Sequence, residues 1–142
     1  MLEALAGNMT TRLSLFFRSR ARSFRYAFSG LWYVIRTQRN AWIHALVSVG
    51  VVLLSLWLGI SPEGWAIIIL AIAMVWTAEF INTALEAVVD LASHQEQQEL
   101  ARVGKDVGAA AVLIAAGSSV VIGLLVLGPP LWERLRTLFS IP

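Results

Sequence analysis

The sequence predicts an all-α membrane protein, in which three transmembrane helices follow an N-terminal amphipathic surface helix. The 142 residues are 58% hydrophobic and only 14% charged, a composition too apolar for an ordinary soluble domain. Three apolar stretches are each long enough to cross a bilayer, and an arginine-rich segment precedes them. We therefore expect residues 1–142 to form a single membrane domain.

The segment 8–39 is expected to be the surface helix. Arginines alternate there with aromatic and aliphatic residues, a pattern typical of a helix on an anionic membrane surface. A merely solvated basic leader would also contain these residues. Met1 to Thr11 lack a cationic region that leads into an apolar one, so we expect no cleaved signal peptide. The alternating residues are Arg12, Arg18, Arg20, Arg22, Arg25, Arg36 and Arg39, with Leu15, Phe16, Phe17, Phe24, Tyr26, Phe28, Leu31, Trp32 and Ile35.

The first two predicted spans are residues 41–60 and 65–92. Ser61-Pro-Glu-Gly64 separates them with strong turn signals. The second stretch is longer than the roughly 20 residues that a crossing needs, and it is fully apolar only in its first half. We therefore expect its C-terminal end to protrude beyond the hydrocarbon.

The third predicted span is 106–127, and Gly128-Pro129-Pro130 is expected to stop it. The tail 131–142 combines apolar residues with Arg134 and Arg136. Such a composition suits the membrane interface, where we place the tail.

Four polar side chains interrupt the second span. With about 100° per helical residue and Glu79 at zero, Asn82 falls near 300°, Glu86 near 340° and Asp90 near 20°, so all four share one stripe. A charged side chain near the bilayer centre costs at least about 2.5–3.5 kcal/mol, so the stripe needs a cation, a metal or water beside it. A chain this small buries few polar groups alone, and we therefore expect a homo-oligomer.

The distribution of basic residues predicts the orientation. Most of them precede the first span and the first loop has none, which places the N-terminus in the cytoplasm. The polar segment 93–105 then returns to the cytoplasmic side. Arg134 and Arg136 disagree mildly, because three spans put them outside.

This orientation gathers basic residues and carboxylates at the cytoplasmic face. A nucleoside triphosphate with Mg²⁺ needs cations for its phosphates and hard oxygen ligands for the metal, so a membrane-embedded phosphotransferase is plausible. Neither a P-loop nor a kinase Gly-rich loop is present. The absence of cysteine excludes disulfides and thiolate chemistry. We also expect no nucleic-acid partner. The gathered residues are Arg22, Arg39, Glu86, Asp90, Lys105 and Asp106.

Two long motifs resemble the bacterial family of diacylglycerol and undecaprenol kinases. They are Glu79-Phe-Ile-Asn-Thr-Ala-Leu-Glu-Ala-Val-Val-Asp90 and Lys105-Asp106-Val-Gly-Ala-Ala-Ala-Val-Leu-Ile114; Ala27-Phe-Ser-Gly30 and Arg39-Asn40 through Ile43-His44 extend the likeness to about residues 20–127. The resemblance implies a homotrimer in the inner (cytoplasmic) membrane, with its active site facing the cytoplasm. It also implies transfer of the γ-phosphate of ATP, with Mg²⁺, to a membrane lipid hydroxyl. His44 and its surroundings resemble the undecaprenol kinases more than the proteobacterial diacylglycerol kinases.

The resemblance assigns roles to the polar stripe. It implies that Glu79 is the general base for the lipid hydroxyl, that Asn82 supports the reacting groups, and that Glu86 binds the metal. Asp90 matches a residue near the nucleotide. A neutral Glu79 bonded across a subunit contact and an exposed cap or ion pair at Asp90 are the alternative interpretations.

Further roles fall on the third span and the surface helix. Lys105 and Asp106 match the family's lysine and aspartate that hold the nucleotide, although such a pair also marks an ordinary membrane boundary. Gly104, Gly108 and the alanines after it match a small-residue face that lets helices or a nucleotide approach closely, which simple helix packing would explain equally well. Arg22 and Tyr26 match positions near the nucleotide.

The sequence departs from the family pattern at two places that bear on whether the protein is an active kinase. Gln38 stands where many members have a second metal-binding glutamate, and an amide ligand should weaken Mg²⁺ affinity. The loop before Lys105 is also about one residue longer and lacks the usual Tyr-His pair. We expect an active kinase for undecaprenol first and diacylglycerol second. The alternatives are a degenerate member that binds lipid or nucleotide without turnover, and a small ion or proton pathway.

Overall fold

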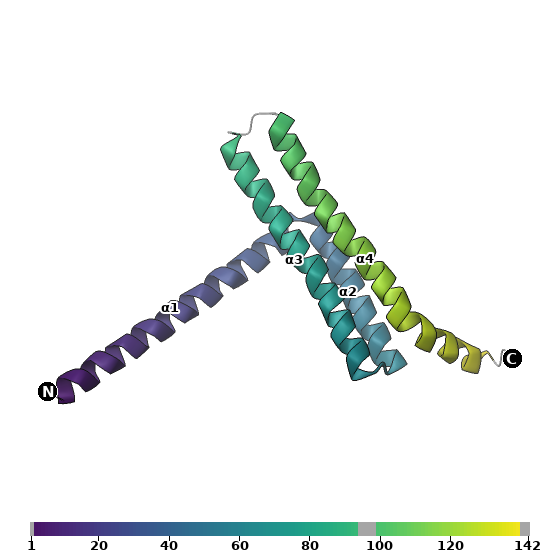
Figure 1. The fold of residues 1–142 in the computed structure, drawn as a ribbon, viewed down its shortest axis with the longest axis horizontal. Coiled ribbons are helices and arrows are strands. Elements are labelled where there is room, and N and C mark those ends of the chain that lie inside the picture. The colour runs from purple at the N-terminus through teal and green to yellow at the C-terminus, as the bar shows by residue number, and fades with distance from the viewer. Residues whose placement is uncertain (1, 94–98, 140–142) are drawn as a thin grey trace. The chain divides into compact units, whose positions relative to one another are not determined.

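The computed structural model describes residues 2–93 and 99–139, without the side chains of 2–14, 16 and 17. Every regular element in these ranges is a helix, which confirms the all-α prediction (Figure 1). Three of the helices are long and apolar enough to cross a membrane; the ranges in which they cross stay predictions. The helices are α1 (Leu2–Thr37), α2 (Arg39–Leu58), α3 (Pro62–Ala92) and α4 (Glu99–Leu138).

The helix α1 forms a unit of its own, and the rest of the chain from Gln38 forms a second one. Within α1 the guanidinium of Arg36 lies 5.8 Å from the centre of the Trp32 ring, a cation–π arrangement. The hydroxyl of Thr37 donates to the carbonyl of Tyr33 at 2.8 Å. The helix ends there because Gln38 takes an extended conformation, with φ −97° and ψ 117°.

A tight turn joins α2 to α3, as its sequence predicts. Gly59 ends α2 in the left-handed region at φ 63°, and its N–H reaches the carbonyls of Ser55 and Leu56. Glycine suits this position because it has no Cβ to clash. Pro62 then begins α3, and the hydroxyl of Ser61 accepts a hydrogen bond from the N–H of Gly64 at 3.2 Å.

Helices α3 and α4 run side by side along most of their length (Figure 1). Small and medium residues are buried between them, among them Ala71, Val112 and Ala115, and such residues let transmembrane helices approach closely. The hydroxyl of Ser119 donates across to the carbonyl of Ala71 at 3.1 Å. Most large apolar side chains of the three apolar helices point outward and stay exposed in the single chain.

The prediction that the third helix stops at Gly128 is wrong, because α4 continues through Pro129 and Pro130 to Leu138. Each proline removes one backbone donor, and in transmembrane helices this loss is tolerated with a kink. Figure 1 shows the C-terminal part of α4 bent away from its main course. The tail predicted at 131–142 is thus helical through Leu138, and residues 140–142 lie outside the described part of the chain.

Candidate active site

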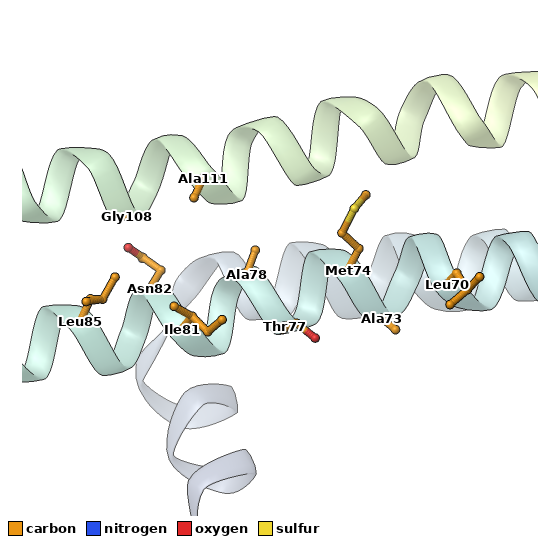
Figure 2. A pocket seen from close by; sticks show the side chains of 10 residues that line it. All are labelled: Leu70, Ala73, Met74, Thr77, Ala78, Ile81, Asn82, Leu85, Gly108 and Ala111. Carbon is orange, nitrogen blue, oxygen red and sulfur yellow. The ribbon is translucent and has the colours of Figure 1, made fainter.

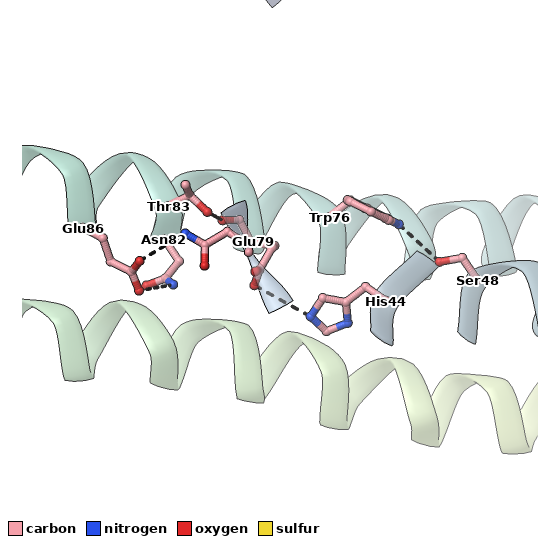
Figure 3. A network of polar contacts seen from close by, with 8 residues as sticks. His44, Ser48, Trp76, Glu79, Asn82, Thr83 and Glu86 are labelled. Atoms are coloured by element: carbon pink, nitrogen blue, oxygen red, sulfur yellow. Dashed lines mark hydrogen bonds and ion pairs between the residues drawn. The ribbon is translucent and has the colours of Figure 1, made fainter. Parts of the chain in front are cut away.

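A row of polar groups on α3 points into the space shared with α2 and α4 (Figure 3). Glu79 and Asn82 are almost fully buried, with 1% and 6% of their surface exposed. Glu86 is half-buried and Asp90 is exposed. The stripe predicted from helical periodicity therefore becomes less buried from Glu79 to Asp90.

Glu86 is held by two amides. The amide nitrogen of Asn82, one turn earlier on α3, donates to Oε1 at 3.0 Å, and that of Gln38 approaches Oε2 at 3.4 Å. Gln38 occupies the N-cap position of α2 but makes no side-chain cap there. Its side chain reaches across to α3 instead, so the departure from the family pattern lies beside the predicted metal ligand.

Glu79 lies deeper and faces His44 of α2. The two atoms Oε2 of Glu79 and Nε2 of His44 are 3.7 Å apart, and both are buried without a hydrogen-bond partner. The hydroxyl of Thr83 donates to the backbone carbonyl of Glu79 at 2.9 Å. The carboxylate thus lies beside the His44 imidazole, which the sequence indicated only as a point of resemblance to the undecaprenol kinases.

The predicted nucleotide residues of α3 and α4 form two separate pairs. Lys105 of α4 makes an ion pair with Asp90 of α3, one turn beyond Glu86. Asp106 is exposed and instead pairs with Arg102 on its own helix at 3.5 Å. Arg22 and Tyr26 are exposed on α1 and are described with that unit alone. The described contacts therefore connect Lys105, and not Asp106, to the row on α3.

A close approach of α4 fixes Asn82 from the other side. A Cβ added at Gly108 would collide with Oδ1 of Asn82, so a larger residue there would displace the Asn82 amide. This Oδ1 is itself buried without a hydrogen-bond partner. Asn82 thus donates to Glu86 and keeps an acceptor free for another group.

An apolar groove of about 480 Å³ between α3 and α4 was not predicted from the sequence (Figure 2). Asn82 and the hydroxyl of Thr77 are its polar groups, and every other lining residue is apolar. The alternation of small and large side chains every three or four residues was the available signal. The groove is lined by Leu70, Ala73, Met74, Thr77, Ala78, Ile81, Asn82, Leu85, Gly108 and Ala111.

The donor set suits a metal that shares its ligands with phosphates. Among the described residues no three His, Asp or Glu side chains gather as a metal cluster. Mg²⁺ is commonly bound by one or two carboxylates together with substrate phosphates and water. Glu86 offers the carboxylate, and Gln38 could add an oxygen only if its amide turned, because its nitrogen now faces Glu86.

Helices α2 to α4 therefore define a small helical membrane protein with carboxylates and amides gathered between them. Residues 25–127 match the model of the family described as prokaryotic diacylglycerol kinase, and the chain belongs to this family. This confirms the resemblance found in the motifs.

Individual relatives agree on the family and differ in their printed substrates. The chain is 43% identical over 109 residues to a diacylglycerol kinase of Synechocystis sp., covering 77% of this chain and 62% of that protein. It is 37% identical over 110 residues to the undecaprenol kinase of Bacillus subtilis, covering 78% and 89%. A diacylglycerol kinase of Escherichia coli is 35% identical over 96 residues, covering 63% and 78%.

Proposed function

We propose that this protein is a lipid kinase that transfers the γ-phosphate of ATP to the hydroxyl of a membrane lipid. The observation that carries the proposal is the buried Glu79 in line with the amide-held Glu86 on one side of α3. Seven helical residues separate the two carboxylates by about 10 Å along the axis, which leaves room for a phosphate between base and metal.

Each residue has a distinct part in this proposal. Glu79 accepts the proton of the lipid hydroxyl as that oxygen bonds to the γ-phosphorus and ADP leaves. Glu86 and Gln38 would hold Mg²⁺, which neutralises developing phosphate charge when it is bound. Asn82 orients Glu86 and offers its unpaired Oδ1 to the reacting groups. Lys105 would leave Asp90 to meet the phosphates, with Asp106 at the same helix start.

We place the nucleotide end at the cytoplasmic face of the inner membrane. The basic residues before α2 favour this orientation. In helical register Arg18, Arg22, Arg25 and Arg36 fall within an arc of about 60°, which suits phosphate headgroups. The aromatic and aliphatic residues Phe24, Phe28, Leu31 and Ile35 fall within another arc of about 60°, so α1 has the pattern of a surface helix with Arg22 and Tyr26 exposed.

The end of α4 is proposed to lie at the opposite interface. In helical register its apolar residues fall within an arc of about 120°, with Glu133 opposite and Arg134 and Arg136 flanking the arc. The guanidinium of Arg134 lies 5.7 Å from the ring centre of Trp57 near the end of α2. The apolar residues are Leu131, Trp132, Leu135, Leu138 and Phe139.

The groove between α3 and α4 supports the proposed homotrimer. Thr77 and Asn82 add polar groups to a face of exposed Leu70, Ile81 and Leu85. Polar groups inside a membrane favour contact with protein over contact with lipid tails. A second copy of the chain therefore suits this face.

We put undecaprenol first and diacylglycerol second as the lipid. The surroundings of His44 resemble the undecaprenol kinases, and the Bacillus subtilis enzyme is covered over 89% of its length. The names of the relatives divide between the two lipids. Both present a hydroxyl next to a long apolar tail, and burial of such tails is not directional.

Gln38 favours a second candidate function, in which the protein is a degenerate member of the family that binds lipid or nucleotide without turnover. Its amide nitrogen, rather than an anionic oxygen, faces Glu86. ATP consumption by the purified protein in mixed micelles tests both candidates, with undecaprenol, diacylglycerol or no added lipid. The kinase proposal expects consumption that depends on one of the lipids. Binding of Mg-ATP with no consumption in any mixture would establish the second candidate.

A further inference from the structure

The ring of His44 is the only ionisable group of α2 between Asn40 and Leu58. Its side chain is 15% exposed and its Nε2 lies 3.7 Å from Oε2 of Glu79, whose side chain is 1% exposed. Neither atom has a hydrogen-bond partner. A distance slightly beyond a hydrogen bond means that a small rotation of either side chain would join the two groups.

Neighbouring side chains confine the imidazole. The Trp76 ring meets it edge to face with a centroid distance of 6.4 Å and an interplanar angle of 66°. The indole N–H of Trp76 donates to Ser48 Oγ on α2 at 3.2 Å, and the ring also packs against Phe80 at 6.0 Å. His44 is therefore bounded by an anchored indole and by the carboxylate (Figure 3).

Among the residues that the structure describes from Gln38 onward, His44 is the one basic side chain seen in contact with Glu79. On α3 the next ionisable group along the row is Glu86, which repels a second negative charge. Residues 107–132, which make up most of α4, contain no ionisable side chain. An ionised carboxylate in an apolar span is costly unless a cation accompanies it. A protonated imidazole at His44 would supply that cation.

We propose that His44 is a positioning residue for Glu79, and that its imidazolium pairs with Glu79 and keeps it in the carboxylate form. This proposal rests on the role of Glu79 in the proposed function. The pair would exist before the lipid arrives. The hydroxyl proton then passes to Glu79 as the oxygen–phosphorus bond forms and the bond to ADP breaks, while His44 retains its own proton.

Infrared spectroscopy of the protein in lipid bilayers at neutral pH tests the pairing without turnover. In the wild type we expect no band of a protonated carboxyl from Glu79. His44→Gln should produce such a band, and the double variant His44→Gln with Glu79→Gln should lose it, which assigns the band to Glu79. The same Glu79 band in wild type and His44→Gln, or its absence from both, would overturn the proposal.

The pH dependence of kcat supplies a second readout that a packing role would not move. In His44→Gln the acidic half-maximal point should move to higher pH by at least about one unit, because an opposite charge within about 4–6 Å is lost. Ser48→Ala is the matched control, since it releases Trp76 but keeps the pair, and its half-maximal point should stay where the wild type has it. A lower rate in His44→Gln at an unmoved half-maximal point would reduce His44 to a packing residue.

ATP consumption and the infrared band together separate this proposal from the kinase proposal. If no lipid supports ATP consumption but the infrared band appears as expected, the kinase function fails and the His44–Glu79 pairing stands. If consumption is normal and the band does not respond to His44→Gln, the pairing fails and the kinase function stands.

Discussion

The two sides of α3 differ in how they meet their neighbours. In the apolar half of α3 the contact with α4 is made by small side chains and one hydroxyl, as at Ala71, Ala115 and Ser119. Towards α2 it includes carboxylates, amides and an imidazole, as at Glu79 and Glu86. Close packing of small residues stabilises a transmembrane pair, whereas buried polar groups are costly there. Under the proposed function, the apolar part of the α3–α4 contact maintains the fold, and the polar groups beside α2 perform the chemistry.

Loss of the Glu86 carboxylate should have the largest effect. Glu86→Ala removes the one carboxylate that both amides hold, so Mg-ATP affinity in titration should fall at least about tenfold. The matched control is Glu63→Ala, an exposed carboxylate in the first turn of the same helix, which should bind normally. Undiminished Mg-ATP affinity in Glu86→Ala would remove Glu86 from the metal site.

A methyl group added at Gly108 tests whether the approach of α4 to Asn82 holds the polar row of α3 in place. Gly108→Ala should displace the amide of Asn82, and with it Glu86, so kcat should drop roughly 10- to 100-fold, as for losses of metal-supporting groups. Gly104→Ala is the control, because a Cβ there meets Val89 Cγ2 at an ordinary 3.5 Å. Equal kinetics in the two variants would show that the Gly108 contact is packing alone.

An anionic ligand at position 38 should strengthen Mg²⁺ binding beside Glu86. Gln38→Glu adds a carboxylate beside Glu86, so the Mg²⁺ concentration for half-maximal lipid phosphorylation should fall several-fold, and activity should survive or rise. Gln38→Leu, of similar size without an oxygen, should raise that concentration. If neither the wild type nor Gln38→Glu phosphorylates any candidate lipid, the kinase proposal is contradicted.

The smallest effect is expected on the α4 side. Ser119→Ala deletes the hydrogen bond to the carbonyl of Ala71, which is worth about 0.6 kcal/mol on average in membranes. Unfolding in detergent should show a loss of that order, with unchanged kcat. A fall in kcat as large as that of Gly108→Ala would remove the distinction between the two sides.

Periodicity predicted much of this arrangement from sequence. The 100° rotation per residue placed Glu79, Asn82 and Glu86 on one stripe, and the Ser61–Gly64 turn signals predicted the hairpin. Contacts between helices could not be predicted from the sequence, because they depend on the relative register of α2, α3 and α4. The approach of His44 to Glu79 is of this kind. The course of α4 through two prolines was missed because proline rules from soluble helices are relaxed inside membranes.

The most direct test of the account follows labelled γ-phosphate from ATP to lipid in wild type and Glu79→Gln. Glutamine keeps the size of the side chain but cannot accept the hydroxyl proton as a carboxylate does. The account predicts labelled lipid phosphate in the wild type, and at least about a hundredfold less in Glu79→Gln, with Mg-ATP affinity and oligomeric state retained. Transfer at the wild-type rate by Glu79→Gln would contradict the claim that the polar side of α3 performs the chemistry.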